Sequence, residues 1–133
     1  MIVPTMSPLR ADLYPSLGDF FRACGEGHMA DWEWNPANTL LALHEDRVVG
    51  FVSAWVDGQP YAWIDPLLVH PDHRNQGIGV WLGWTMEAIL QKRGVSVIRV
   101  LARDDGDLIP QLKRCGMKLK GSYTILEKTY AAS

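Results

Sequence analysis

The sequence predicts a single α/β (α+β) domain, and three features in its middle carry that prediction. Three strand-like runs, at residues 39–44, 48–56 and 61–69, follow one another with only short turns between them, which indicates an antiparallel meander. Residues 79–93 then show a wide apolar stripe at helical spacing. A short apolar run at 97–102 follows, and its length favours a buried strand.

The segment before the meander predicts one strand and one helix. Residues 2–5 form a short strand-like run. The next apolar residues are spaced i, i+4, i+7, i+8 and i+11, which places them on one helix face: Leu13, Leu17, Phe20, Phe21 and Cys24. We expect Asp12 to cap this helix at its N-terminus, and Gly25 and Gly27 to end it.

The remaining elements lie around and after the central helix. Asp57-Gly58 predicts a hairpin turn between the second and third strands of the meander. Four tryptophans divide into a cross-strand pair and a pair expected in the core: Trp55 with Trp63, and Trp81 with Trp84. A short helix at 108–115, capped by Asp107, precedes two terminal strands, at 117–120 and 123–128. The domain is expected to span residues 1–133.

Composition narrows the class of protein. The chain has 133 residues, 47% of them apolar, which is enough for one core. It has neither a run of 18 apolar residues nor a basic and apolar leader, so we expect no membrane span and no signal peptide. Cys24 and Cys115 fit no disulfide framework and no metal site, and we expect both to be reduced and half-buried. A cytoplasmic protein is the default, and the net charge of −2 argues against nucleic acid as a partner.

The most informative stretch joins the third meander strand to the central helix, at residues 69–79. It holds two glycines spaced G-x-G, one arginine and the unpaired N–H groups of a helix N-terminus, which together suit a phosphate or pyrophosphate. This anion site lies in the basic part of the chain, since residues 67–133 carry ten basic and six acidic side chains. Residues 1–66 carry three basic and nine acidic side chains, which would suit a cationic binding partner. A chance distribution of surface charges explains the asymmetry equally well.

Two common phosphate motifs are excluded at this joint. The dinucleotide fingerprint needs a third glycine where Leu82 stands, and the chain has no Gly-Lys followed by Ser or Thr. What matches is V-x-P-x-x-R-x-x-G-x-G, from Val69 to Gly79. Here the chain resembles the GNAT superfamily of acetyl-CoA-dependent N-acetyltransferases, and its element order is similar to theirs over nearly the whole chain, most closely from about residue 48 to 117.

That resemblance implies a fold and a cofactor site. The fold would be a central mixed sheet with an antiparallel meander and a splayed parallel strand pair, with helices on both faces. Acetyl-CoA would be the co-substrate, with pantetheine pairing to the strand around Leu67, Leu68 and Val69. The pyrophosphate would bind the loop and helix start: Arg74, Asn75, Gln76, Gly77, Ile78, Gly79 and Val80. Asp105 loosely matches an asparagine often found near the head of the next helix. Pro66 donates no ladder hydrogen bond, so we expect a bulge there.

The candidates for catalysis follow from the need for a neutral amine. An ammonium must lose a proton before it can attack a thioester, and Asp65, just before the cofactor strand, is the first candidate for the group that accepts it. Glu33 is the second, in the loop that lines the acceptor pocket in the family. Its neighbours Trp32 and Trp34 suit a cationic amine, although anchoring the loop to the core is at least as plausible a role.

One departure from the family concerns the general acid. Relatives often carry a tyrosine four residues before the glycine of Y-x-x-x-G-F, whereas Leu112 stands at that position here. Tyr123 or water would have to protonate the leaving thiolate. The expected function is transfer of an acetyl group from acetyl-CoA to a primary amine by direct attack in a ternary complex. The alternative is a catalytically weak or inactive acyl-CoA-binding sensor or interaction module of the same fold.

The sequence leaves the acceptor open between a small-molecule amine and a peptide or protein amine. No nucleic acid and no membrane is expected among the partners. The oligomeric state is also left open, a homodimer included.

Overall fold

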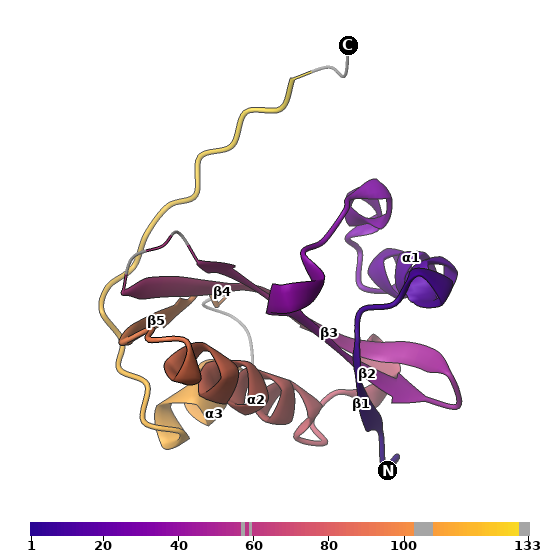
Figure 1. The fold of residues 1–133 in the computed structure, drawn as a ribbon, viewed down its shortest axis with the longest axis horizontal. Coiled ribbons are helices and arrows are strands. Elements are labelled where there is room, and N and C mark those ends of the chain that lie inside the picture. The colour runs from indigo at the N-terminus through magenta and orange to yellow at the C-terminus, as the bar shows by residue number, and fades with distance from the viewer. Residues whose placement is uncertain (57, 59, 103–107, 131–133) are drawn as a thin grey trace.

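The computed structural model describes residues 1–56, 58, 60–102 and 108–130 of the chain. One mixed sheet runs through the molecule, with helices on both of its faces (Figure 1). The strands are β1 (Thr5–Pro8), β2 (Thr39–His44), β3 (Arg47–Val56), β4 (Tyr61–Val69) and β5 (Val97–Val100). The α-helices are α1 (Tyr14–Ala23), α2 (Ile78–Lys92) and α3 (Leu108–Arg114), with short 3-10 turns at Ala11–Leu13, Gly27–Asp31, Pro36–Asn38 and Pro71–His73.

The sheet has the order β1-β2-β3-β4-β5. Each pair of neighbours among β1, β2, β3 and β4 is antiparallel, so the predicted meander is confirmed. β5 runs parallel to β4, as a strand–helix–strand connection requires. The register between β3 and β4 shifts between Val52 and Ala54, opposite the Asp65-Pro66 stretch of β4. The expected irregularity at Pro66 is therefore present.

The core divides into one cluster on each face of the sheet. On one face α2 inserts Ile78, Leu82, Met86 and Leu90, all less than 5% exposed, against small and branched residues of β2, β3 and β4. On the other face α1 contributes the residues of its predicted stripe, including Phe20 and Phe21. α2 lies close to the sheet because it packs directly over Gly50. A Cβ on Gly50 would meet Leu82 Cδ1 at 2.8 Å and Ile78 Cγ2 at 3.0 Å.

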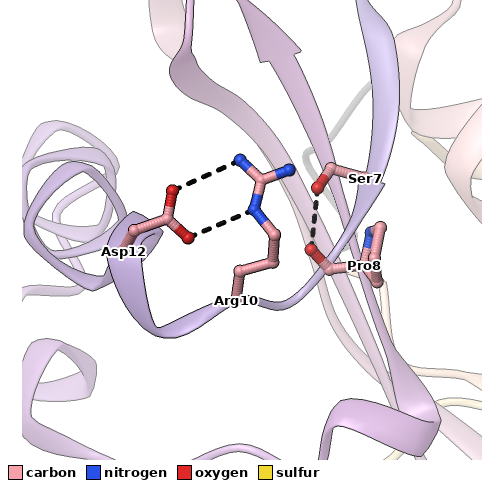
Figure 2. Close-up of polar contacts among 4 residues, drawn as sticks. All are labelled: Ser7, Pro8, Arg10 and Asp12. Atoms are coloured by element: carbon pink, nitrogen blue, oxygen red, sulfur yellow. Dashed lines mark hydrogen bonds and ion pairs between the residues drawn. The ribbon is translucent and has the colours of Figure 1, made fainter.

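The N-terminal prediction was right in kind and wrong in detail. The first strand is Thr5–Pro8 rather than residues 2–5, and Asp12 does not cap α1. Its carboxylate instead accepts from Arg10, at 3.1 Å from Nε and 3.4 Å from Nη2, while the Ser7 hydroxyl donates to the Pro8 carbonyl at 2.8 Å (Figure 2). This local pairing takes the place of the cap, since Asp12 lies within the 3-10 turn Ala11–Leu13 and Leu13 is the N-cap residue of α1.

Two further expectations were wrong. Residues 117–120 and 123–128 form no strand, and Lys118 to Tyr130 lie exposed in an extended segment that leaves the body of the molecule (Figure 1). The segment meets no strand of the described chain with which to pair. Trp81 packs partly against the α2 core cluster as expected. Trp84 is 58% exposed because it stands on the other side of α2 from Leu82. Cys24 and Cys115 are free and half-buried, as predicted.

Candidate active site

The site begins where β4 and β5 part. β5 pairs with β4 only from Tyr61 to Ile64, so beyond Ile64 the β5-facing edge of β4 has no strand partner in the described part of the chain. The other edge of Leu67, Leu68 and Val69 is paired with β3. A strand paired on one side presents free backbone groups on the other, which can bind an extended ligand. The predicted splay of the parallel pair is therefore present.

The loop after β4 supplies a second set of free backbone groups. The first N–H groups of α2, at Ile78, Gly79 and Val80, precede the first hydrogen bond of the helix, in which Trp81 N–H donates to Gly77 O at 3.0 Å. Gly77 caps α2 in a left-handed conformation, with φ +83 and ψ 5, and Asn75 has φ 61. This turn directs the free N–H groups and the positive end of the 15-residue helix to one place.

Three side chains fix that loop to the rest of the fold. Ile78 is 4% exposed and anchors the first turn of α2 in the core, so only its backbone can meet a ligand. Arg74 Nε donates to Val69 O at 3.1 Å, and Cys24 Sγ lies 3.7 Å from the same oxygen. Gln76 Oε1 accepts from the backbone N–H of Ile2 at 3.1 Å. The sequence predicted that Arg74 and Gln76 bind the cofactor. In the structure, the side chains of both residues hold the loop against the rest of the fold.

The pKa of Cys24 reflects its place between these groups. Burial of the thiol raises its pKa, and Arg74 opposes this rise through its charge and a hydrogen bond. A raised pKa keeps the thiol neutral at physiological pH, and only a thiolate is a strong nucleophile. Cys24 is therefore an unsuitable nucleophile, in agreement with a mechanism of direct attack.

A small apolar cavity lies under the open edge of β4. Ile64 and Leu67 line it from β4, Val100 from β5, and Val80, Gly83, Trp84 and Glu87 from α2, while Leu112, Cys115 and Met117 close it. The cavity has a volume of about 10 Å³, which is too small to hold the arm of a ligand. Gly79 brings the start of α2 close to the end of β4, since a Cβ there would meet Val69 Cγ2 at 3.4 Å. The free strand edge and the anion loop thus adjoin one another. This combination suits a ligand with an anionic group at the loop and an extended arm along the edge.

Asp65 is half-buried and lies on the face of β4 opposite the apolar cavity. Burial raises the pKa of its carboxyl above the ordinary value of 3.8, and the negative charge of Glu26 raises it further. Glu26 comes from the turn after α1, and its carboxylate lies 3.5 Å from Nε2 of His28. The indole N–H of Trp55 donates to the backbone carbonyl of Asp65 at 3.1 Å. Asp65 is thereby a carboxylate with raised basicity beside a second acidic group.

Sequence reasoning missed Glu26 and His28. The pattern Gly25-Glu26-Gly27 predicted a helix end, and it gave no sign that the helix end faces β4. That placement depends on how α1 packs on the sheet.

The other predicted residues lie apart from Asp65. Glu33 lines a shallow hollow with Tyr14, Asp31, Trp32 and Trp34, and no β4 residue borders it. Trp34 serves the core as well, since its ring contacts Phe21 and Phe51. The indole nitrogen of Trp34 is buried with no hydrogen-bond partner among the described residues.

Two candidates belong to the C-terminal part of the chain. Tyr123 is 80% exposed in the extended segment and makes no hydrogen bond with the described chain. Asp105 lies outside the described residues, as do Asp57 and Asp107.

Two other kinds of site are absent from the described ranges. No three His, Cys, Asp or Glu side chains gather there in a way that could hold a metal ion. No helix in the same ranges combines the length and the apolar character that crossing a bilayer requires.

Comparison with known proteins agrees with this geometry. A family model described as the acetyltransferase (GNAT) family matches residues 8–117. No curated protein matches the chain. Among solved structures, an aminoglycoside acetyltransferase from an uncultured soil metagenomic sample superposes with a TM-score of 0.72 at 19% identity, over 96% of this chain and 100% of that one.

Two further structures share the fold. A ribosomal-protein-alanine N-acetyltransferase from Brucella melitensis has a TM-score of 0.70 and 17% identity, over 95% of this chain and 100% of that one. The PaiA N-acetyltransferase from Thermoplasma acidophilum, solved in complex with coenzyme A, has a TM-score of 0.67 and 13% identity, over 86% and 89%. At these identities the superpositions establish the fold alone.

Proposed function

The chain belongs to the GNAT acetyltransferase family and is an acyltransferase, and we propose that it transfers an acetyl group from acetyl-CoA to a primary amine. One observation carries the choice of donor. The free N–H groups at the start of α2 and the unpaired edge of β4 meet where Gly79 approaches Val69. A pyrophosphate on the loop and a pantetheine arm along the edge would use both sets of donors, as anions use helix N-termini and extended ligands use strand edges.

The reaction we propose needs no covalent enzyme intermediate. Bound acetyl-CoA supplies an activated thioester carbonyl. Asp65 accepts the proton that the attacking ammonium must lose, directly or through one water, and its raised pKa brings its basicity closer to that of its substrate. A backbone N–H on the open edge of β4 donates to the carbonyl oxygen as negative charge develops on it. Glu33 and Tyr123 remain as second candidates for the base and for the acid.

A second function is favoured by one residue. Leu112 lines the apolar cavity at the position where relatives often carry a tyrosine, so no side chain there can protonate a leaving thiolate. The chain would then bind acyl-CoA and act as a sensor or interaction module with little turnover. The enzyme would take a small-molecule or protein amine as its acceptor, whereas the module would need no acceptor.

Two measurements separate these proposals. Acetyl-CoA at 100 times its Kd should stabilise the fold by about 2.7 kcal/mol, read as a rise in Tm, whereas ATP at the same concentration should give a much smaller rise. Free thiol release over a panel of amines then reports turnover. Stabilisation without thiol release favours the module. Equal stabilisation by ATP and acetyl-CoA would mean that the site binds polyanions without recognising the pantetheine arm.

A further inference from the structure

The face of the sheet that carries α1 is only partly covered, and aromatic side chains gather on the uncovered part. Trp55 on β3 pairs with Trp63 on β4, and Trp63 pairs with Arg99 on β5, so the three side chains form one row across the sheet. Trp55 is 64% exposed and Trp63 is 37% exposed, whereas Ala62 and Ile64 on the other face are fully buried. Contiguous exposed aromatic surface of this kind usually marks a binding site.

Arg99 adds a positive charge to this surface. Its guanidinium carbon lies 5.0 Å from the centre of the Tyr61 ring and 5.5 Å from that of Trp63, so the side chain leans from β5 over β4. Stacking on two rings orders a side chain that would otherwise be mobile. No carboxylate in the described part of the chain forms an ion pair with Arg99. Its charge-assisted hydrogen bonds are therefore available to a ligand.

Asp65 stands at the other end of the same surface. It lies two residues beyond Trp63 on β4, and the indole N–H of Trp55 donates to its backbone carbonyl at 3.1 Å. Strand spacings place Asp65 about 7–10 Å from the guanidinium, with Trp63 between them on β4 and Trp55 beside them on β3. Glu26 increases the negative charge at the Asp65 end. The surface is thus acidic at one end, basic at the other and aromatic in the middle.

A ligand that complements this surface has the opposite arrangement of charge. We propose that Arg99 determines acceptor specificity by binding a carboxylate, so that the preferred acceptor is a short peptide segment with a free N-terminal amine at Asp65. An extended chain covers about 3.3–3.6 Å per residue, so the carboxylate belongs two or three residues beyond the amine. The guanidinium binds it through paired N–H donors, and the peptide backbone lies across Trp55 and Trp63. This inference rests on the proposed N-acetyltransferase function.

The test compares two acceptors that differ only in the carboxylate: trialanine and its C-terminal amide. We expect kcat/KM for trialanine to exceed that for the amide by about tenfold or more, mainly through KM, as a charge-assisted hydrogen bond predicts. Arg99→Gln should remove the preference by lowering kcat/KM for trialanine alone. Arg99→Lys should keep part of it, because the charge remains without the planar donor pair. Arg47→Gln, which changes an exposed arginine at the far end of β3, should leave the ratio unchanged.

Several results would overturn the inference. A ratio near one in the wild type, or a ratio that survives Arg99→Gln, would show that Arg99 does not read the carboxylate. An equal loss for both peptides in Arg99→Gln would assign Arg99 to the fold or to holding another occupant, such as the chain's own extended C-terminal segment. Acetylation of neither peptide would also refute it. The rise in Tm with acetyl-CoA, measured on the same samples, reports separately on the proposed function.

Discussion

Gly77 and Gly79 stand two residues apart in the anion loop, and the structure predicts opposite effects on stability when each becomes alanine. Gly77 has φ +83, and a Cβ there would meet nothing within 4 Å. Gly77→Ala therefore introduces backbone strain without a clash, and we expect a loss of about 1–2 kcal/mol. For a chain of 133 residues this lowers Tm by roughly 4–7 °C.

Gly79 lies in the first turn of α2, where a methyl group would contact Val69 at an ordinary distance of 3.4 Å. Alanine is the better helix former, so Gly79→Ala should leave the free energy of unfolding unchanged or raise it by up to about 0.5–1 kcal/mol. The same methyl group stands between the free N–H groups and the end of β4. We therefore expect acetyl-CoA affinity to fall about tenfold or more, which corresponds to about 1.4 kcal/mol.

Calorimetric titration of acetyl-CoA and thermal unfolding of both variants test this separation of stability from binding. Gly58→Ala is a matched control, because Gly58 has φ +64 with open space around it and lies at the opposite end of β4. It should lose stability as Gly77→Ala does and keep wild-type affinity. The reasoning is refuted if Gly79→Ala binds acetyl-CoA as tightly as the wild type, or if Gly77→Ala unfolds at the wild-type temperature.

Four further substitutions test the site and its support. Asp65→Asn should lower kcat by roughly 10²–10⁴-fold if Asp65 is the base. It should also raise Tm at pH 7 and not below about pH 3.8, because a raised pKa means that wild-type stability falls as pH rises through it. Glu26→Gln removes a charge that raises the pKa of Asp65, so the acid limb of the kcat/KM profile should move to lower pH; an unmoved limb would separate the two carboxylates. Gly50→Ala crowds Leu82 and should lower the free energy of unfolding in urea by about 1–3 kcal/mol. Leu112→Tyr should raise turnover or shift its pH profile if a hydroxyl at that position reaches the sulfur, and identical kinetics would place the acid elsewhere.

The sequence predicted best the parts of the fold that depend on neighbouring residues. The meander, the central helix and the glycine-rich joint each follow from a local pattern of apolar residues and turns, and all three are present. The irregularity at Pro66 was predictable for the same reason, since proline lacks the donor that a ladder needs. The position of the anion loop could therefore be predicted from the order of the residues alone.

The parts that were missed depend on contacts between distant segments. Residues 123–128 were predicted as a strand, yet a strand-like composition does not supply a pairing partner, and the segment stays extended. Trp84 shares helical spacing with Trp81, yet only the packed sheet decides which side of α2 is inside. Glu26 reaches Asp65 because α1 lies across the sheet, and Arg99 meets Trp63 only through strand register. These relations are absent from any local pattern.

Gly50 does not line the apolar cavity, yet it determines how closely α2 packs on the sheet. The helix carries the anion loop at its N-terminal end, and its first two turns sit directly on this glycine, through Ile78 and Leu82. The height of the loop above the open edge of β4 is therefore fixed from beneath. If acetyl-CoA binds as proposed, a methyl group at Gly50 would lift the helix and shift the loop relative to the strand edge without altering either one.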